Sequence, residues 1–177
     1  YIALALSSYG LIGSVSGKIF HSYQLQRSAL RTAYLAPVAL LISTVSLVIA
    51  FLRHDFRLEY VADHSNLAMD PIYTWVAFYS GNEGSLLYIA LVLSLLTVIT
   101  VYFMPKALES IKPYTFAILV GILTFFLAVM TFMANPFDTL PFIPGDGQGI
   151  NPLLTHPGMF FHPPMLMAGL VGISVPF

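Results

Sequence analysis

Apolar residues run along this chain in five stretches, separated by polar or proline-rich segments. They cover residues 2–15, 34–52, 86–104, 114–134 and 165–177. Each of the three central stretches approaches the roughly 20 residues that a helix needs to cross about 30 Å of hydrocarbon. The first stretch is short and rich in Ser and Gly, and the last is too short to span a bilayer alone. The pattern predicts about five transmembrane helices, the last of them incomplete.

A further apolar and aromatic segment, residues 71–79, precedes the third long stretch. If it continued as one helix to Met104, that helix would be about 50 Å long, which is too long for a bilayer. The polar residues 80–85 interrupt it. We therefore predict a separate helix lying in the outer membrane interface, where Trp and Tyr are favoured. Ser85 or Asn82 is the expected cap of the spanning helix that follows.

Composition places the chain among integral membrane proteins. Hydrophobic residues make up 58% of it and charged residues 8%, whereas a soluble domain carries about a quarter charged residues. A soluble enzyme, a nucleic-acid-binding protein and a disordered tail are thereby excluded, and the net charge of −1 offers no basic surface to a phosphate backbone. Without Cys the chain has no disulfide and no thiolate nucleophile or ligand. The expected fold is an all-α, polytopic transmembrane bundle, one domain over residues 1–177, surrounded by membrane lipid.

Basic residues predict the orientation of this bundle. The first and third connections between the apolar stretches hold five Lys or Arg residues, the second holds two, and the segment 135–164 holds none. Loops rich in Lys and Arg remain on the inner side of a membrane. The N-terminus and the two long connections are therefore predicted to face outward. The five inner residues are Lys18, Arg27, Arg31, Lys106 and Lys112, and the two outer ones are Arg53 and Arg57.

Histidine supplies the only soft-metal ligands, and among the five histidines His162 has the most informative setting. Aromatic residues 160–161 precede it and Pro163-Pro164 follow it. A residue before proline favours an extended conformation, and Pro164 is suited to the first position of the fifth helix. His162 would then project from the outer end of that helix, as an axial haem ligand requires. The alternative is an interfacial histidine that anchors a helix end.

The other candidates have weaker support. Glu83 stands in a polar turn before a spanning helix, where an acidic side chain is either functional or stabilises the helix dipole. His64 is a candidate for ligation or polar support. His21 is expected at the surface and His54 at an interface. His156 and His162 are six residues apart and each is followed by proline, so helix geometry does not bring these two histidines together.

Several short motifs, taken together and in order, resemble the CcmF family of haem lyase components in cytochrome c maturation. The similarity is collinear from about residue 31 to residue 177. It rests on Asp55-Phe56 with Tyr60-Val61, Glu83-Gly84-Ser85-Leu86-Leu87, Asn135-Pro136-Phe137 with Leu140-Pro141, Asn151-Pro152-Leu153-Leu154, Pro157-Gly158, and Phe161-His162-Pro163-Pro164-Met165-Leu166.

The resemblance implies that the chain receives haem from the chaperone CcmE and positions it for attachment to Cys-x-x-Cys-His of apocytochrome c. In this family two histidines flank a Trp-rich WWD motif and hold the incoming haem, and His162 matches the first of them. The motif, the second histidine and the ligands of a resident haem b come later in the family. The chain is therefore expected to be the N-terminal part of a longer or split protein. His156 departs from the family, which usually has an acidic residue there.

The resulting expectation is a haem site on the outer side of a membrane, with no catalytic side chain in this part of the protein. His162 would be the axial ligand of the haem iron, with Phe160, Phe161, Pro163 and Pro164 beside the haem and Glu83 as a supporting group. The expected partners are CcmE, apocytochrome c, and other maturation subunits or complementary CcmF fragments.

The expected location is the bacterial inner membrane, with the functional loops on the periplasmic side, or else the mitochondrial inner membrane. Two other functions stay open. A transporter or channel-type subunit would use Glu83 in an ion or proton path. A haem-free structural subunit would use the outer loops only to dock partners.

Overall fold

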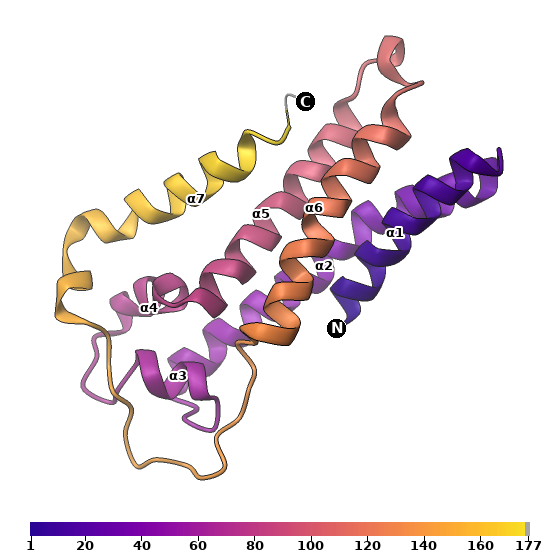
Figure 1. Cartoon of the computed structure of the whole chain (residues 1–177). Coiled ribbons are helices and arrows are strands. Elements are labelled where there is room, and N and C mark those ends of the chain that lie inside the picture. Colours follow the sequence, from indigo (N-terminus) through magenta and orange to yellow (C-terminus); the bar gives the residue numbers. More distant parts are fainter. Residues whose placement is uncertain (176–177) are drawn as a thin grey trace.

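The computed structural model describes residues 1–175, and every regular element in that range is a helix (Figure 1). Four helices are long and apolar enough to cross a membrane. They are α1 (Ile2–Ile19), α2 (Tyr23–Leu52), α5 (Asn82–Phe103) and α6 (Lys112–Met133). Helix α1 packs against α2 and α6, and α5 packs against α6 and α2, so the four form one bundle. The expected all-α membrane bundle is confirmed.

Shorter elements lie in the connections, most of them at one end of the bundle (Figure 1). Helix α7 starts at that end and runs beside α5, the long helix that it contacts. The short elements are α3 (Glu59–His64), η1 (Pro71–Tyr73), α4 (Thr74–Ser80), η2 (Lys106–Leu108), η3 (Pro152–Thr155), η4 (Pro157–Phe160) and α7 (His162–Gly172).

The first two helices are longer than their apolar stretches. Only residues 20–22 separate α1 from α2, so Lys18, Arg27 and Arg31 lie on helices, and the prediction that they occupy a loop was wrong. Polar residues such as Gln and Arg are good helix formers, and a helix continues past the apolar window wherever they follow. The ammonium group of Lys18 lies 5.0 Å from the ring centre of Tyr114 at the start of α6. This contact brings the end of α1 next to the start of α6, and the prediction that this end of the bundle faces inward stays a prediction.

Two histidines end helices in the left-handed conformation. His21 follows α1 with φ 51° and His54 follows α2 with φ 49°. At each end, the amide one residue further on donates to a carbonyl of the last turn: Ser22 N to Gly17 O at 2.9 Å, and Asp55 N to Ala50 O at 3.0 Å. Such a bond satisfies a free carbonyl group at a helix end, and the residue in the left-handed position is usually glycine. Both histidines therefore terminate helices here.

Small residues on α1 let it lie close to its neighbours. A Cβ atom on Gly10 would come 2.5 Å from the Thr32 hydroxyl oxygen of α2, and one on Gly13 would come 3.0 Å from the Ala29 Cβ. In a membrane, where lipid tails are as apolar as leucine, such close backbone packing is a main source of helix association. The Ser and Gly content of the first stretch therefore reflects its interface with α2 and α6.

The predicted helix over residues 71–79 is present as η1 and α4. Its Val76, Ala77 and Phe78 side chains are fully buried, so it packs into the bundle, while its position in a membrane interface stays a prediction. The predicted caps of α5 were wrong, because α5 begins at Asn82 after Gly81, without a side-chain cap. The Ser85 hydroxyl instead donates to the Tyr79 carbonyl oxygen at 2.7 Å, since α4 ends against the first turn of α5.

Helix α7 begins at His162, earlier than expected. Pro163 and Pro164 lie in its first turn, where their missing amides leave no helix bond unmade. The amide of Met165 makes the first such bond, to the Phe161 carbonyl oxygen at 3.1 Å. The expectation of an extended His162 with the helix opening at Pro164 was therefore wrong. Residues 176–177 of the fifth apolar stretch lie outside the described part of the chain.

Candidate functional site

His162 is exposed at the start of α7, where the turn formed by η4 ends. Two large apolar side chains near it in the sequence are also exposed at the surface: Phe161 is 75% exposed and Met165 is 73% exposed. An imidazole in this position can reach the iron of a flat apolar molecule that lies over the start of α7. Among residues 1–175 no group of three or more His, Asp or Glu side chains is arranged to hold a metal ion. His162 would therefore act as a single ligand of this chain.

Three aromatic side chains from the bundle hold the backbone on both sides of His162. The Trp75 indole N–H of α4 donates to the Phe160 carbonyl oxygen at 3.2 Å. The Tyr79 hydroxyl, also on α4, donates to the Met159 carbonyl oxygen. The Tyr88 hydroxyl on α5 donates to the Pro164 carbonyl oxygen at 3.3 Å. The segment that carries His162 is thus bonded to two helices that precede it by some 75 to 85 residues.

The same aromatic side chains pack against one another. The Trp75 ring stands edge-on to Tyr79 and Tyr88, at centroid distances of 5.5 and 6.3 Å. The rings of Tyr73 and Phe160 lie 5.8 Å apart. Burial raises the pKa of Tyr79 to about 12, so its hydroxyl stays protonated and able to donate at neutral pH.

The structure separates the two phenylalanines that the sequence pairs with haem. Phe160 is half-buried and packs against the core beside Tyr73, so its ring anchors the turn. Phe161 projects outward beside His162. Pro163 is half-buried and Pro164 is buried against the bundle. Of the expected neighbours, Phe161 has the exposure needed to touch a molecule bound at His162.

Glu83 lies elsewhere, in a polar cleft of about 230 Å³. The cleft is formed by α3, the first turn of α5 and the segment after α6, and His162 is not among the residues that line it. Its acidic and imidazole side chains are Glu59, Asp63, His64, Glu83 and Asp138. The structure therefore does not bring Glu83 and His162 together, and Glu83 has the first-turn position that stabilises a helix dipole.

Tyr60 of α3 fixes the turn between α4 and α5. Its hydroxyl donates to the Phe78 carbonyl oxygen at 2.9 Å and accepts from the Gly81 amide at 3.1 Å. Burial raises the pKa of Tyr60 to about 12, so the phenol stays neutral. A Cβ atom on Gly84 would overlap the Phe78 carbonyl oxygen, so this close contact requires glycine. The turn thereby sets the position of α4, which holds the His162 segment.

The proline-rich connection after α6 is held against α3. The amides of Gln148 and Gly149 donate to the carbonyl oxygens of Ala62 and Ser65, at 2.7 and 3.1 Å. The Leu67 amide donates to the Asp146 carboxylate at 2.8 Å. Although it has little regular structure, this segment is fixed by hydrogen bonds to the same end of the bundle as α4.

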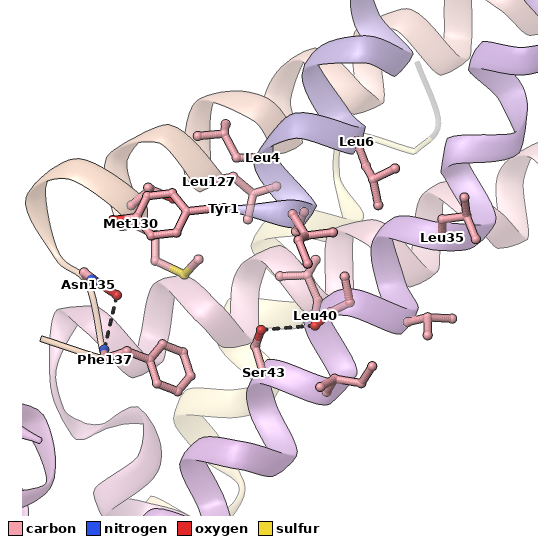
Figure 2. Close-up of a pocket in the computed structure, with 16 residues that line it drawn as sticks. Tyr1, Leu4, Leu6, Leu35, Leu40, Ser43, Leu127, Met130, Asn135 and Phe137 are labelled. Carbon is pink, nitrogen blue, oxygen red and sulfur yellow. Dashed lines mark hydrogen bonds between the residues drawn. The ribbon is translucent and has the colours of Figure 1, made fainter.

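An apolar cavity of about 910 Å³ lies on another side of the bundle, between α1, α2 and α6 (Figure 2). Apolar side chains such as Leu4, Leu40 and Leu127 line it, with Ser43 and Asn135 as polar neighbours. The Ser43 hydroxyl is used within α2, where it donates to the Ala39 carbonyl oxygen at 3.1 Å. No His lines this cavity, and the lining side chains of a kind that can ligate haem iron are Tyr1 and Met130.

Sequence reasoning missed Trp75, Tyr79 and Tyr88. The aromatic run over residues 71–79 predicts a helix lying in the interface, and it does not predict hydrogen bonds to the His162 segment. Buried Trp and Tyr usually find a hydrogen-bond partner for their polar tips. That rule predicts that partners exist, but not which carbonyl groups they are.

Comparison with known proteins places these features in a family. The sequence profile of the family described as "Cytochrome C assembly protein" matches residues 79–177. The cytochrome c-type biogenesis protein CcmF of Escherichia coli (strain K12) is 37% identical over 99% of this chain and 27% of its own length. CcmF of Pseudomonas aeruginosa is 42% identical over 72% of this chain and 20% of its own length.

A solved structure of "Cytochrome c Heme Lyase CcmF" has the same arrangement of helices. It matches with a TM-score of 0.82 and 32% sequence identity, over 98% of this chain and 27% of that one. NrfE of Haemophilus influenzae, also a cytochrome c-type biogenesis protein, is 35% identical over 82% of this chain and 23% of its own length. The chain thus spans about a quarter of the length of the relatives that it matches.

Proposed function

Because this chain belongs to the cytochrome c assembly protein family and is similar to its CcmF members, we propose that it is the N-terminal part of a haem lyase, longer or split, and that it holds haem through His162. The single observation that carries the proposal is the exposed imidazole at a helix start, beside exposed apolar side chains and on a backbone tied to the bundle. An imidazole on a fixed backbone is how proteins commonly ligate haem iron.

In the proposed reaction haem is a substrate that passes through the protein. Each of two cysteine thiols of apocytochrome c adds across a vinyl group: a C–S bond forms, the thiol hydrogen goes to the other vinyl carbon, and no net oxidation occurs. The contribution of this chain is to hold haem in one orientation beside the Cys-x-x-Cys-His segment, which makes the addition effectively unimolecular. Since this chain has no Cys, it cannot itself reduce the substrate thiols, and the reductant comes from outside this chain.

The channel-type alternative has less support. The turns of α5 that follow Glu83 are closely packed. Three of their side chains are fully buried, those of Leu87, Ala90 and Leu93, so the bundle is closed there. A proton or ion path from Glu83 would need polar groups or water along that face. Stabilisation of the helix dipole at the start of α5 accounts better for the Glu83 carboxylate.

The proposal predicts transfer of haem from a haem-loaded chaperone. When the complete protein is mixed with haem-loaded CcmE in detergent, the protein should gain about one haem per molecule above the amount bound before mixing, and the difference spectrum of the gained haem should show imidazole ligation. A channel or a haem-free structural subunit would leave the haem on the chaperone. Transfer that does not exceed the amount taken up by an unrelated membrane protein would therefore refute the proposed function.

The proposed orientation places the His162 end of the bundle outside, in the periplasm of a bacterium. It predicts that a cysteine at Gly145 reacts with an impermeant maleimide added to intact cells, whereas one at Gln24 reacts only after the membrane is opened. Both positions are exposed, and a side chain at Gly145 meets no atom within 4 Å. Gly147 is unsuitable, because a Cβ atom there would overlap the Ser65 carbonyl oxygen. Labelling at Gln24 with protection at Gly145 would reverse the orientation.

A further inference from the structure

We propose that Trp75, Tyr79 and Tyr88 are positioning residues for haem capture, which they serve by holding the backbone on both sides of His162. We call these three residues the aromatic clamp. This inference rests on the proposed function, because it assigns to the clamp the orientation of the imidazole that would bind iron. None of the three side chains needs to touch haem to have this effect.

The bonding pattern of the clamp is suited to fixing a direction. Two of its hydrogen bonds end on consecutive carbonyl groups before His162, those of Met159 and Phe160, and the third ends on the Pro164 carbonyl just after it. The donors come from two helices, α4 and α5. The segment is hydrogen-bonded to α4 before His162 and to α5 after it, so it cannot rotate about a single attachment. These bonds thereby limit the direction of the Cα–Cβ bond of His162.

Apolar packing holds part of this segment, since Met159 and Phe160 pack against the core and Pro164 is buried. Helix α7 then packs against α5, and much of its remaining surface is open, with Leu166 59% and Leu170 63% exposed. The consecutive prolines supply no amide donors of their own. Carbonyl groups at the edge of an apolar environment need partners, because leaving them unpaired there is costly. The clamp supplies those partners from side chains whose rings are already packed against one another.

Loosening the clamp should weaken haem binding without removing the ligand. If the competent orientation is populated for only part of the time, the apparent affinity falls by that fraction. One lost hydrogen bond of ordinary strength corresponds to about a fivefold change in such an equilibrium. We expect about fivefold weaker haem capture in Tyr79→Phe or Tyr88→Phe, and at least tenfold in the double variant.

The test uses the complete protein in detergent and measures two quantities for each variant. Hydrogen exchange of the amides in residues 158–166 reports whether the segment has loosened, independently of haem. Titration with haem, measured above the haem bound before titration, reports the affinity, and the low-spin share of this added haem, compared with that in His162→Gly, reports how much of the iron is ligated by His162. The matched control is Tyr102→Phe, which removes the hydroxyl of an exposed tyrosine near the other end of α5.

The inference expects exchange in residues 158–166 to accelerate in the double variant, together with weaker haem capture and a lower low-spin share, while Tyr102→Phe behaves as the parent protein. Unchanged exchange would overturn the clamp, whatever happens to haem. Faster exchange with normal haem capture, in a protein whose His162→Gly variant loses haem, would overturn the positioning role alone. Normal capture in His162→Gly as well would overturn the proposed function itself.

Discussion

Replacing His162 with glycine should abolish haem capture from the chaperone and reduce the yield of holocytochrome c by at least about a hundredfold, since removing an essential ligand or catalytic group typically costs that much or more. The loss has a simple physical cause, because the apolar surface remains but the iron has no ligand from this chain. The fold should survive, since the side chain is exposed and α7 begins with residues whose amides make no helix bond. The measurement is haem content of the purified protein together with holocytochrome yield in cells.

Added imidazole should restore part of the capture, because the site opened by glycine is exposed and accepts a free ligand. His21→Gly is the control. His21 lies at the opposite end of the bundle in a left-handed conformation, which glycine adopts more easily. Capture should be normal there, with a fold more stable by about 1 kcal/mol. Full haem capture and normal yield in His162→Gly would instead make this histidine an interface anchor.

Gly84→Ala should destabilise the fold by more than about 4 kcal/mol, which is exceptional for one methyl group. The added carbon would overlap the Phe78 carbonyl oxygen and approach the Tyr60 hydroxyl to 2.6 Å, so α4 and α5 must separate. Because α4 carries Trp75 and Tyr79, the same change should loosen the His162 segment. The measurement is thermal unfolding in detergent, with the yield of folded protein.

Gly121→Ala supplies the comparison for this prediction. Gly121 lies within α6, and its new methyl group would meet its nearest neighbour, Leu11 Cδ1, at an ordinary 3.6 Å. Alanine is the better helix former by up to about 1 kcal/mol, so this variant should be as stable as the parent or more so. Equal melting temperatures for Gly84→Ala and the parent protein would show that the α4–α5 turn is not as tight as described.

The membrane helices could be predicted from the sequence because hydropathy over some 20 residues depends on local composition alone. Their ends could not be predicted in the same way. Helix α2 extends eleven residues before its apolar stretch, through polar residues that continue a helix outside the hydrocarbon. Helix α3, with six residues, depends on tertiary hydrogen bonds such as Glu59 N to Asp138 O at 3.0 Å. No window of local sequence contains such information.

The site, too, could be predicted from the sequence only in part. His162 was singled out by its neighbours in sequence and by the resemblance to CcmF. The conformation predicted for it was wrong, because a preference for extended backbone before proline is weak beside the packing of a whole helix. Glu83 was predicted to support the haem site because an acidic side chain near a membrane is usually functional, but α3 and the segment after α6 hold it in a separate cleft. The aromatic clamp joins residues 76 to 85 positions apart, a pairing that is not visible in one sequence.

The central claim is that the imidazole of His162 binds the iron of haem, and exchanging the ligand tests it most directly. In His162→Cys, the haem that the complete protein gains from CcmE should change from an imidazole-type to a thiolate-type absorption and EPR spectrum. The spectrum is taken as the difference from the protein before capture, so that the resident haem b implied by the resemblance to CcmF does not contribute. This chain has no cysteine of its own, so any thiolate ligand that comes from this chain is the one introduced at position 162. A thiolate spectrum in the variant is the result that the account predicts. An unchanged imidazole spectrum, with haem bound in normal amount, would contradict it.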